Sequence, residues 1–106
     1  MWETLFKIDK IDDNSMKAVT VKGIPLLIAN IHGKIYATDL YCTHEQTDLS
    51  EGFIEKCKVI CPAHFASFDL RTGHVVSGRQ DESSAIDNLK SYNTKIEDGI
   101  IMVELP

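Results

Sequence analysis

Two pairs of cysteine and histidine constrain this chain more than any other feature of its sequence. The first pair is Cys42-Thr43-His44, and the second is Cys61-Pro62-Ala63-His64. A single cysteine or histidine is most often a packed or capping residue. The whole chain, however, has only three cysteines and four histidines, so that two ordered pairs are improbable by coincidence. The spacing therefore predicts a metal centre.

Two kinds of metal centre accept two cysteines and two histidines. Structural zinc binds such a set in a tetrahedron, although zinc fingers usually group the cysteines in one pair and the histidines in the other. Mixed pairs suit a [2Fe-2S] cluster, in which one iron takes both thiolates and the other takes both imidazoles. The residues alone leave both open: an iron–sulfur protein, or a zinc-stabilised interaction module that unfolds with chelators.

Length and charge narrow the class of protein. At 106 residues the chain is expected to form a single domain, residues 1–106. A formal net charge of −5 argues against nucleic acid as a partner. The opening "MWETLFKIDK" does not resemble a secretory leader, and the apolar run "IPLLIA" is too short to span a bilayer, so we expect no membrane association and a cytoplasmic location.

The hydrophobic pattern predicts an all-β fold. Short runs of β-branched and aromatic residues recur between glycine and Asx turns, and no helical period is sustained. Glycines that can supply a positive φ predict hairpins turning at His32-Gly33, Thr72-Gly73 and Asp98-Gly99. Both cysteine–histidine pairs lie between residues 40 and 80, where strands are expected to end.

The two pairs resemble the ligand boxes of Rieske proteins. The similarity extends through Leu49-Ser50-Glu51-Gly52, Phe68-Asp69, Thr72-Gly73 and residues 92–99. Within the family, the chain looks most like the small Rieske-type ferredoxins of ring-hydroxylating dioxygenase and multicomponent monooxygenase systems. The resemblance implies an antiparallel β-sandwich or barrel base with a small inserted cluster-binding β subdomain at about residues 40–80, the Rieske or ISP-like fold.

The resemblance also implies a cofactor and a function. Cys42 and Cys61 would bind the buried iron of a [2Fe-2S] cluster, and His44 and His64 the outer iron. The protein would be a one-electron carrier and not an enzyme. It would accept electrons from an NAD(P)H-dependent flavoprotein reductase and pass them to a terminal oxygenase, as a monomer that docks transiently. A cluster-based redox sensor is the alternative within the family.

Two differences from high-potential Rieske proteins bear on the expected reduction potential. High-potential Rieske proteins carry an extra cysteine in each box, and the corresponding residues here are Thr47 and Ala63. Those relatives also place serine and tyrosine hydroxyls near the cluster sulfurs, where this chain has Ala66 and Phe68. Hydrogen bonds to sulfur stabilise the reduced state, so we expect a potential near the low end of the Rieske range, about −150 mV.

Other residues near the boxes have more than one interpretation. Cys57 is expected to be a free thiol on a strand face, since both boxes are complete without it. Glu45, Asp48 and Glu51 either are solvated or steer a basic partner. Relatives often cover the cluster with a proline that this chain lacks, so either a segment within residues 78–88 replaces it or the cluster is more exposed.

Overall fold

The structure is a computed structural model that describes residues 1–43, 46–63, 65–77 and 87–106. Within these residues it is built of antiparallel strands and two short 3-10 helices. The elements are β1 (Trp2–Lys7), η1 (Ile8–Lys10), β2 (Ser15–Val21), β3 (Ile24–Ile31), β4 (Lys34–Asp39), η2 (Leu49–Glu51), β5 (Phe53–Glu55), β6 (Lys58–Ile60), β7 (Ser67–Asp69), β8 (Val75–Ser77), β9 (Ser91–Tyr92), β10 (Thr94–Glu97) and β11 (Ile100–Glu104). The all-β prediction is confirmed. No described helix is long and apolar enough to cross a membrane.

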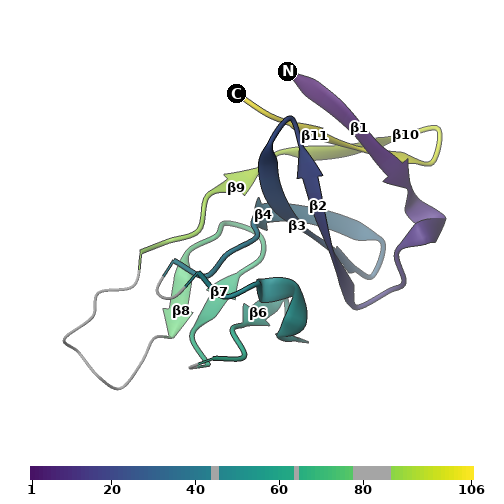
Figure 1. Cartoon of the computed structure of the whole chain (residues 1–106). Coiled ribbons are helices and arrows are strands. Elements are labelled where there is room, and N and C mark those ends of the chain that lie inside the picture. Colours follow the sequence, from purple (N-terminus) through teal and green to yellow (C-terminus); the bar gives the residue numbers. More distant parts are fainter. Residues whose placement is uncertain (44–45, 64, 78–86) are drawn as a thin grey trace.

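Two sheets form the base of the molecule (Figure 1). One has the order β1-β11-β10 and the other β2-β3-β4-β9. The hairpins within them turn where the sequence predicts: His32 and Gly33 have φ of 54° and 86°, and Asp98 and Gly99 have φ of 52° and 76°. Two consecutive left-handed residues match the twist of a tight hairpin, which explains the glycine at the second position.

Strand β3 is the central element, because it is buried on both faces. Leu26 and Ile28 point into an apolar core shared with β11, whereas Leu27 and Ala29 belong to a second core that contains Cys42 and Cys61. All four side chains are fully buried. Alternation along a strand sends successive residues to opposite faces, so an uninterrupted apolar run serves two cores at once.

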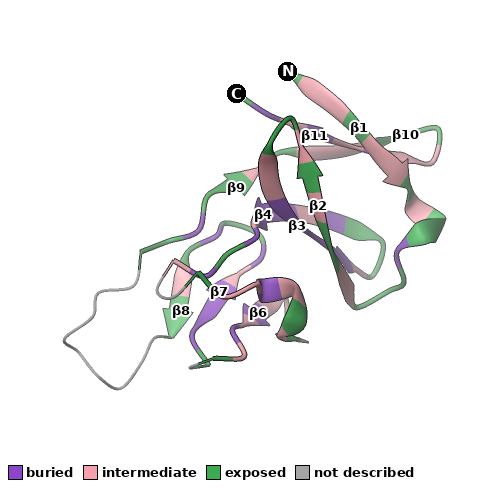
Figure 2. Ribbon diagram, viewed as in Figure 1, coloured by how far each residue is buried: buried purple, intermediate pink, exposed green. Residues whose placement is uncertain are grey.

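The third sheet, of order β5-β6-β7-β8, is inserted between β4 and β9 in the chain. It lies below the base in Figure 1, and Figure 2 shows buried residues where it faces β3 and β4. Strands β4 and β9 pair with each other through Ala37 with Tyr92 and Thr38 with Ser91. The chain therefore leaves the base at the end of β4 and re-enters it at the neighbouring strand β9. The inserted segment between these strands contains both cysteine loops.

Candidate metal centre

The first cysteine loop is a chain reversal between Tyr41 and Asp48, which form an isolated bridge. The Cys42 N–H donates to the carbonyl oxygen of Thr47 at 2.8 Å, and the Gln46 N–H donates to the carbonyl oxygen of Cys42 at 2.8 Å. Gln46 has a left-handed φ of 58°. The backbone of Cys42 is thus held at both its donor and its acceptor.

The second cysteine loop repeats this arrangement at the end of β6. The Cys61 N–H donates to the carbonyl oxygen of Ala66 at 2.7 Å, and the Phe65 N–H donates to the carbonyl oxygen of Cys61 at 2.9 Å. Phe65 has a left-handed φ of 62°. Each cysteine therefore bonds to the residues four and five positions later, so that the two loops present equivalent cysteines.

Both thiols are buried in one apolar core. Cys42 and Cys61 are each 2% exposed, and they share a hydrophobic cluster with Leu27, Leu49 and Phe68. Iron–sulfur clusters are held by cysteine thiolates and are tuned by burial and nearby hydrogen bonds. Two buried soft donors on matched loops fit the cysteine half of such a site.

The histidine half of the prediction lies outside the described residues, because neither His44 nor His64 is among them. The other two histidines are on the surface. The His32 ring lies 3.3 Å from the Asp13 carboxylate, and His74 is exposed in the turn before β8. Neither belongs to the core that contains Cys42 and Cys61.

The third cysteine does not occupy the predicted position. Cys57 was expected on a strand face, but it lies in the turn between β5 and β6 with φ of 62°, directly after Lys56 at φ of 49°. The sequence predicts a hairpin over residues 52–62, but it does not place the turn at Lys56 and Cys57, because neither residue is glycine. Burial raises the pKa of the Tyr36 phenol, and its hydrogen bond and proximity to Cys57 raise that pKa further. Cys57 thus joins the turn to β4 of the base.

One of the three acidic residues of the first loop has a structural role. The Asp48 carboxylate accepts hydrogen bonds from the N–H and hydroxyl of Ser50 at 2.8 and 2.6 Å and so caps η2. Glu51 is exposed, and Glu45 is outside the described residues. The steering interpretation is therefore weakest for Asp48.

A glycine allows the second loop to pack closely on η2. A Cβ atom on Gly52 would lie 2.0 Å from the carbonyl oxygen of Ile60 and 3.1 Å from Cδ of Pro62. The residue before Cys61 and the residue after it therefore both approach the Gly52 backbone. This contact explains a glycine at a position whose φ of −91° does not itself demand one.

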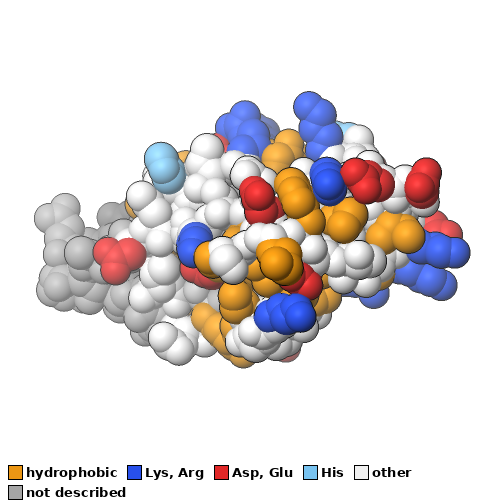
Figure 3. All heavy atoms as spheres, turned by 90° about the horizontal axis from the view of Figure 1, so that it is seen from above, with side chains coloured by type: hydrophobic (Ala, Val, Ile, Leu, Met, Phe, Trp, Pro, Cys, Tyr) orange, Lys and Arg blue, Asp and Glu red, His pale blue; other side chains and the backbone are white. Residues whose placement is uncertain are grey.

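An ion pair braces the turn between β7 and β8. The Arg71 guanidinium donates to both oxygens of Asp69, at 3.0 and 2.8 Å, and the Arg71 N–H donates to Asp69 Oδ1 at 2.8 Å. These hydrogen bonds hold the pKa of Asp69 below its usual value. Figure 3 looks onto the base from above, and there Lys and Arg side chains lie interspersed with Asp and Glu.

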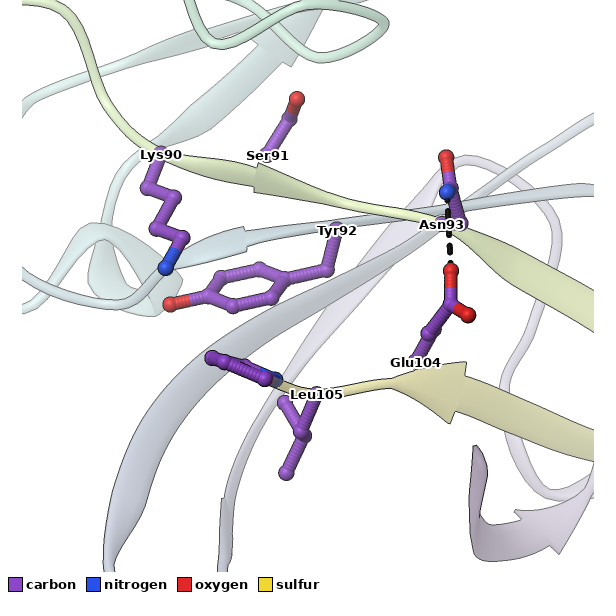
Figure 4. Close-up of a pocket in the computed structure, with 7 residues that line it drawn as sticks. Lys90, Ser91, Tyr92, Asn93, Glu104 and Leu105 are labelled. Atoms are coloured by element: carbon purple, nitrogen blue, oxygen red, sulfur yellow. Dashed lines mark hydrogen bonds between the residues drawn. The ribbon is translucent and has the colours of Figure 1, made fainter. Parts of the chain in front are cut away.

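Two surface pockets flank residues 87–92. One, of about 420 Å³, is lined by residues that include Cys42, Thr43 and Asp87. The other, of about 370 Å³, lies between Tyr92 and the C-terminal residues (Figure 4). There the Asn93 amide donates to Glu104 at 3.0 Å. Burial, together with a hydrogen bond to Asp39, raises the pKa of Tyr92. Among the described residues that line these two pockets, Cys42 in the first pocket is the one predicted ligand.

Comparison with known proteins decides between iron and zinc. A family model described as the Rieske [2Fe-2S] domain matches residues 1–93. The ferredoxin component of the naphthalene 1,2-dioxygenase system of Pseudomonas aeruginosa is 34% identical over 104 residues, which cover 98% of this chain and 95% of that protein. The chain belongs to the Rieske [2Fe-2S] family. Its cofactor is a Rieske-type [2Fe-2S] cluster, and it is an electron carrier and not an enzyme.

Solved structures agree with the fold of this Rieske protein. The ferredoxin of Sphingomonas yanoikuyae B1 superimposes with a TM-score of 0.88 at 27% identity, over 100% of both chains. A chain in the complex of reduced oxygenase and oxidized ferredoxin of carbazole 1,9a-dioxygenase gives a TM-score of 0.86 at 24% identity, over 99% of this chain and 97% of that one. The predicted base with an inserted cluster-binding sheet is confirmed, and the zinc module is not supported.

The sequence pointed to residues 78–88 as a possible cover for the cluster, but it did not predict the contacts of the return segment of this Rieske protein, residues 87–92. The Thr43 hydroxyl donates to the carbonyl oxygen of Asp87 at 2.7 Å, and Leu89 is buried in the same core as the cysteines. No sequence signal connects Thr43 with a residue 44 positions later. The described end of the 78–88 segment thus lies against the first cysteine loop.

Proposed function

We propose that this Rieske protein is the ferredoxin of an oxygenase system, carrying electrons from an NAD(P)H-dependent flavoprotein reductase to a terminal oxygenase. The observation that carries the proposal is the pair of equivalent loops that bury Cys42 and Cys61 in one core. Relatives named as ferredoxin components of dioxygenase systems support it, as does the carbazole 1,9a-dioxygenase complex of an oxygenase with its ferredoxin. The protein would act in the cytoplasm as a monomer.

We assign the cluster ligands to Cys42, His44, Cys61 and His64. The cysteines would hold the buried iron, because their thiols lie in the apolar core, and the histidines would hold the outer iron. When bound, the cluster supplies one reversible electron. Residues 1–106 would work as one Rieske domain, with the cluster-binding part at about residues 40–80.

The surroundings of the cysteines favour a low potential. Ala66 and Phe68 are almost completely buried in the core that contains both cysteines, and neither side chain has a polar hydrogen to donate to sulfur. Apolar packing also keeps water from the thiolates. We therefore place the potential near the low end of the Rieske range, about −150 mV.

The partner surface would lie at the cysteine loops. Phe65 adjoins the proposed ligand His64 and is 65% exposed, and Tyr41 adjoins Cys42 and is 43% exposed. An exposed aromatic residue beside each box offers apolar contact for a transient partner, and redox partners of this kind bury small interfaces. Docking at the cysteine loops would bring the partner close to the cluster, as electron transfer requires.

Visible and EPR spectra before and after dithionite test the cofactor site. We expect a coloured protein whose reduced form gives a Rieske signal, and we expect Cys42→Ser and Cys61→Ser to abolish it. Cys57→Ser is the matched control, because Cys57 is a cysteine of the same core region outside both boxes, and it should retain the signal. A colourless wild-type protein containing one zinc would refute the assignment.

Catalytic electron transfer to an oxygenase distinguishes an electron carrier from a redox sensor. With NADH or NADPH, a dioxygenase-system flavoprotein reductase and the matching oxygenase, the holoprotein should pass electrons catalytically, and product should scale with its concentration. A protein that is reduced once, and then binds a partner only in one oxidation state without turnover, would instead support the redox sensor.

A further inference from the structure

We propose that Thr43 is a positioning residue for the cluster, through a hydrogen bond that ties the first cysteine loop to the return segment, residues 87–92. This inference rests on the ligand set proposed above. Thr43 lies between Cys42 and His44 in the chain, and its Oγ1 donates to the carbonyl oxygen of Asp87 at 2.7 Å. The two residues are 44 positions apart, so that the bond joins separate parts of the fold.

The two residues that follow the acceptor Asp87 are held by the third sheet. The Leu89 N–H donates to the carbonyl oxygen of Gly73 at 2.7 Å, and the Asn88 side-chain oxygen accepts from the Val75 N–H at 2.9 Å. Leu89 is 3% exposed and packs in the core that contains both cysteines. A Cβ on Gly73 would lie 2.2 Å from the Leu89 carbonyl oxygen, so that the segment fits closely against the β7–β8 turn.

The base fixes the same segment from its other end. The Asp39 N–H donates to the carbonyl oxygen of Lys90 at 3.0 Å, and the Lys90 N–H donates to the Asp39 carboxylate at 3.2 Å. The Tyr92 hydroxyl donates to the other oxygen of Asp39 at 2.7 Å. These hydrogen bonds hold residues 88–92, and the Asp87 carbonyl to which Thr43 donates directly precedes this anchored stretch.

The two cysteine loops need different anchors because the residue after each cysteine differs. In the second loop this residue is Pro62, whose ring fixes φ and packs beside Gly52. In the first loop it is Thr43, which has no ring to restrict the backbone. The backbone hydrogen bonds of the two loops are otherwise equivalent. The hydrogen bond of the Thr43 hydroxyl therefore restricts the first loop, as the packed ring of Pro62 restricts the second.

Loss of this bond would open a path to Cys42. Thr43 and Asp87 both line the pocket of about 420 Å³ that reaches Cys42. Without the hydrogen bond from Thr43 to Asp87, the first loop can move away from the return segment. Water and chelators then gain access to the Cys42 thiolate. More water near the cluster favours the reduced, more negative state and raises the potential.

The test compares Thr43→Val, which keeps the shape and removes the hydroxyl, with Thr43→Ser, which keeps the hydroxyl. Thr47→Val is the matched control, because it makes the same change in the same loop, and the described residues show no hydrogen bond of that hydroxyl. We measure the rate at which the visible absorption is lost in chelator, and the midpoint potential. Thr43→Val should lose the cluster roughly fivefold faster than wild type and have a raised potential, with both restored in Thr43→Ser.

Each outcome decides the proposal. A Thr43→Val protein that never acquires a cluster, while Thr43→Ser and Thr47→Val do, supports the role of the hydroxyl. Wild-type behaviour of Thr43→Val, equal loss rates in Thr43→Val and Thr43→Ser, or an equally large effect of Thr47→Val would overturn it. A colourless wild-type protein would instead refute the ligand assignment itself, and the inference with it.

Discussion

Gln46 and Phe65 occupy equivalent places in the two cysteine loops and share a left-handed backbone that glycine adopts most easily. Their N–H groups bond to the cysteine carbonyls, which explains why the conformation is kept despite its strain. Packing does not explain the Phe65 ring, because that residue is 65% exposed. A bulky apolar side chain at a strained, exposed position beside the second box fits the partner surface proposed above.

Ala66→Ser should raise the reduction potential. Ala66 follows Phe65 in the second cysteine loop and is 1% exposed in the core of the cysteines, so a hydroxyl placed there lies in the environment of the proposed cluster. A hydrogen bond to sulfur stabilises the reduced state, and we expect a rise on the order of tens of millivolts. Redox titration followed by visible absorption measures it.

Ala63→Ser is the control for this substitution, since Ala63 is in the same loop but exposed. It should leave the potential close to that of wild type. An unchanged or lowered potential in Ala66→Ser would show that Ala66 is not where a donor reaches the cluster, and the explanation of the low potential would have to be abandoned.

Among the elements, η2 and the second cysteine loop depend on one close contact. Gly52→Ala should destabilise the protein by on the order of 2–3 kcal/mol, because the new Cβ meets the backbone oxygen of Ile60, which cannot move without distorting β6. Urea unfolding of the holoprotein gives the free energy of unfolding.

Gly23→Ala is the control for Gly52→Ala, because it introduces backbone strain at a positive φ without a steric clash. Gly23 has φ of 81° in the β2–β3 turn, and nothing lies within 4 Å of a Cβ placed there. Its substitution should therefore cost only about 1 kcal/mol. If the two variants lost the same stability, the close approach of Gly52 to Ile60 would have no energetic weight.

The Asp69–Arg71 brace makes the β7–β8 turn sensitive to acid. Because the pKa of Asp69 is lower in the folded protein, its contribution to stability is present above the ordinary carboxyl pKa and is lost as pH falls through the lowered value. Asp69→Asn should cost less than about 1 kcal/mol at neutral pH, since the Arg71 side chain is largely exposed. The difference from wild type should shrink below pH 4 or so.

Thermal unfolding of both proteins from neutral to acid pH measures that difference. The control is Glu97→Gln, which removes a carboxylate that pairs with Lys95 on the base surface and is itself mostly exposed. Its pH profile should follow that of wild type. A constant gap between Asp69→Asn and wild type down to acid pH would mean that the charge of Asp69 contributes nothing.

At the scale of the whole molecule, charge should guide partner encounter. The net charge is −5, and the exposed Glu51 lies close after the first cysteine loop. If the partner presents a basic surface to the cysteine loops, the second-order rate of reduction by the reductase should fall as salt rises, since the Debye length shrinks from about 10 Å at 0.1 M to about 3 Å at 1 M.

Stopped-flow reduction over that range of salt measures the effect, with Glu51→Gln as the variant nearest the first loop and Glu3→Gln in β1 as its control. Glu51→Gln should flatten the salt dependence more than Glu3→Gln. Rates that do not respond to ionic strength would exclude electrostatic steering.

The sequence predicts those parts of the structure that depend on neighbouring residues. His32-Gly33 and Asp98-Gly99 carry their turn geometry locally, and Cys42 and Cys61 stand out by spacing. The hairpin over residues 52–62 is predicted, but the position of its turn at Lys56 and Cys57 is not, because two non-glycine residues take left-handed conformations there. The bond from Thr43 to Asp87 was hidden because it joins distant segments, which only the completed fold brings together.

The pairing of β4 with β9 has an evolutionary consequence. The excursion that carries both boxes begins and ends on adjacent strands, so its two ends are as close as the ends of an ordinary hairpin loop. Insertions, exchanges and duplications are tolerated best where the ends of the added chain already meet. The segment between Asp39 and Ser91 can therefore change in length without altering the register of β4 and β9, whereas its core side chains must still fit Leu27 and Ala29 of β3.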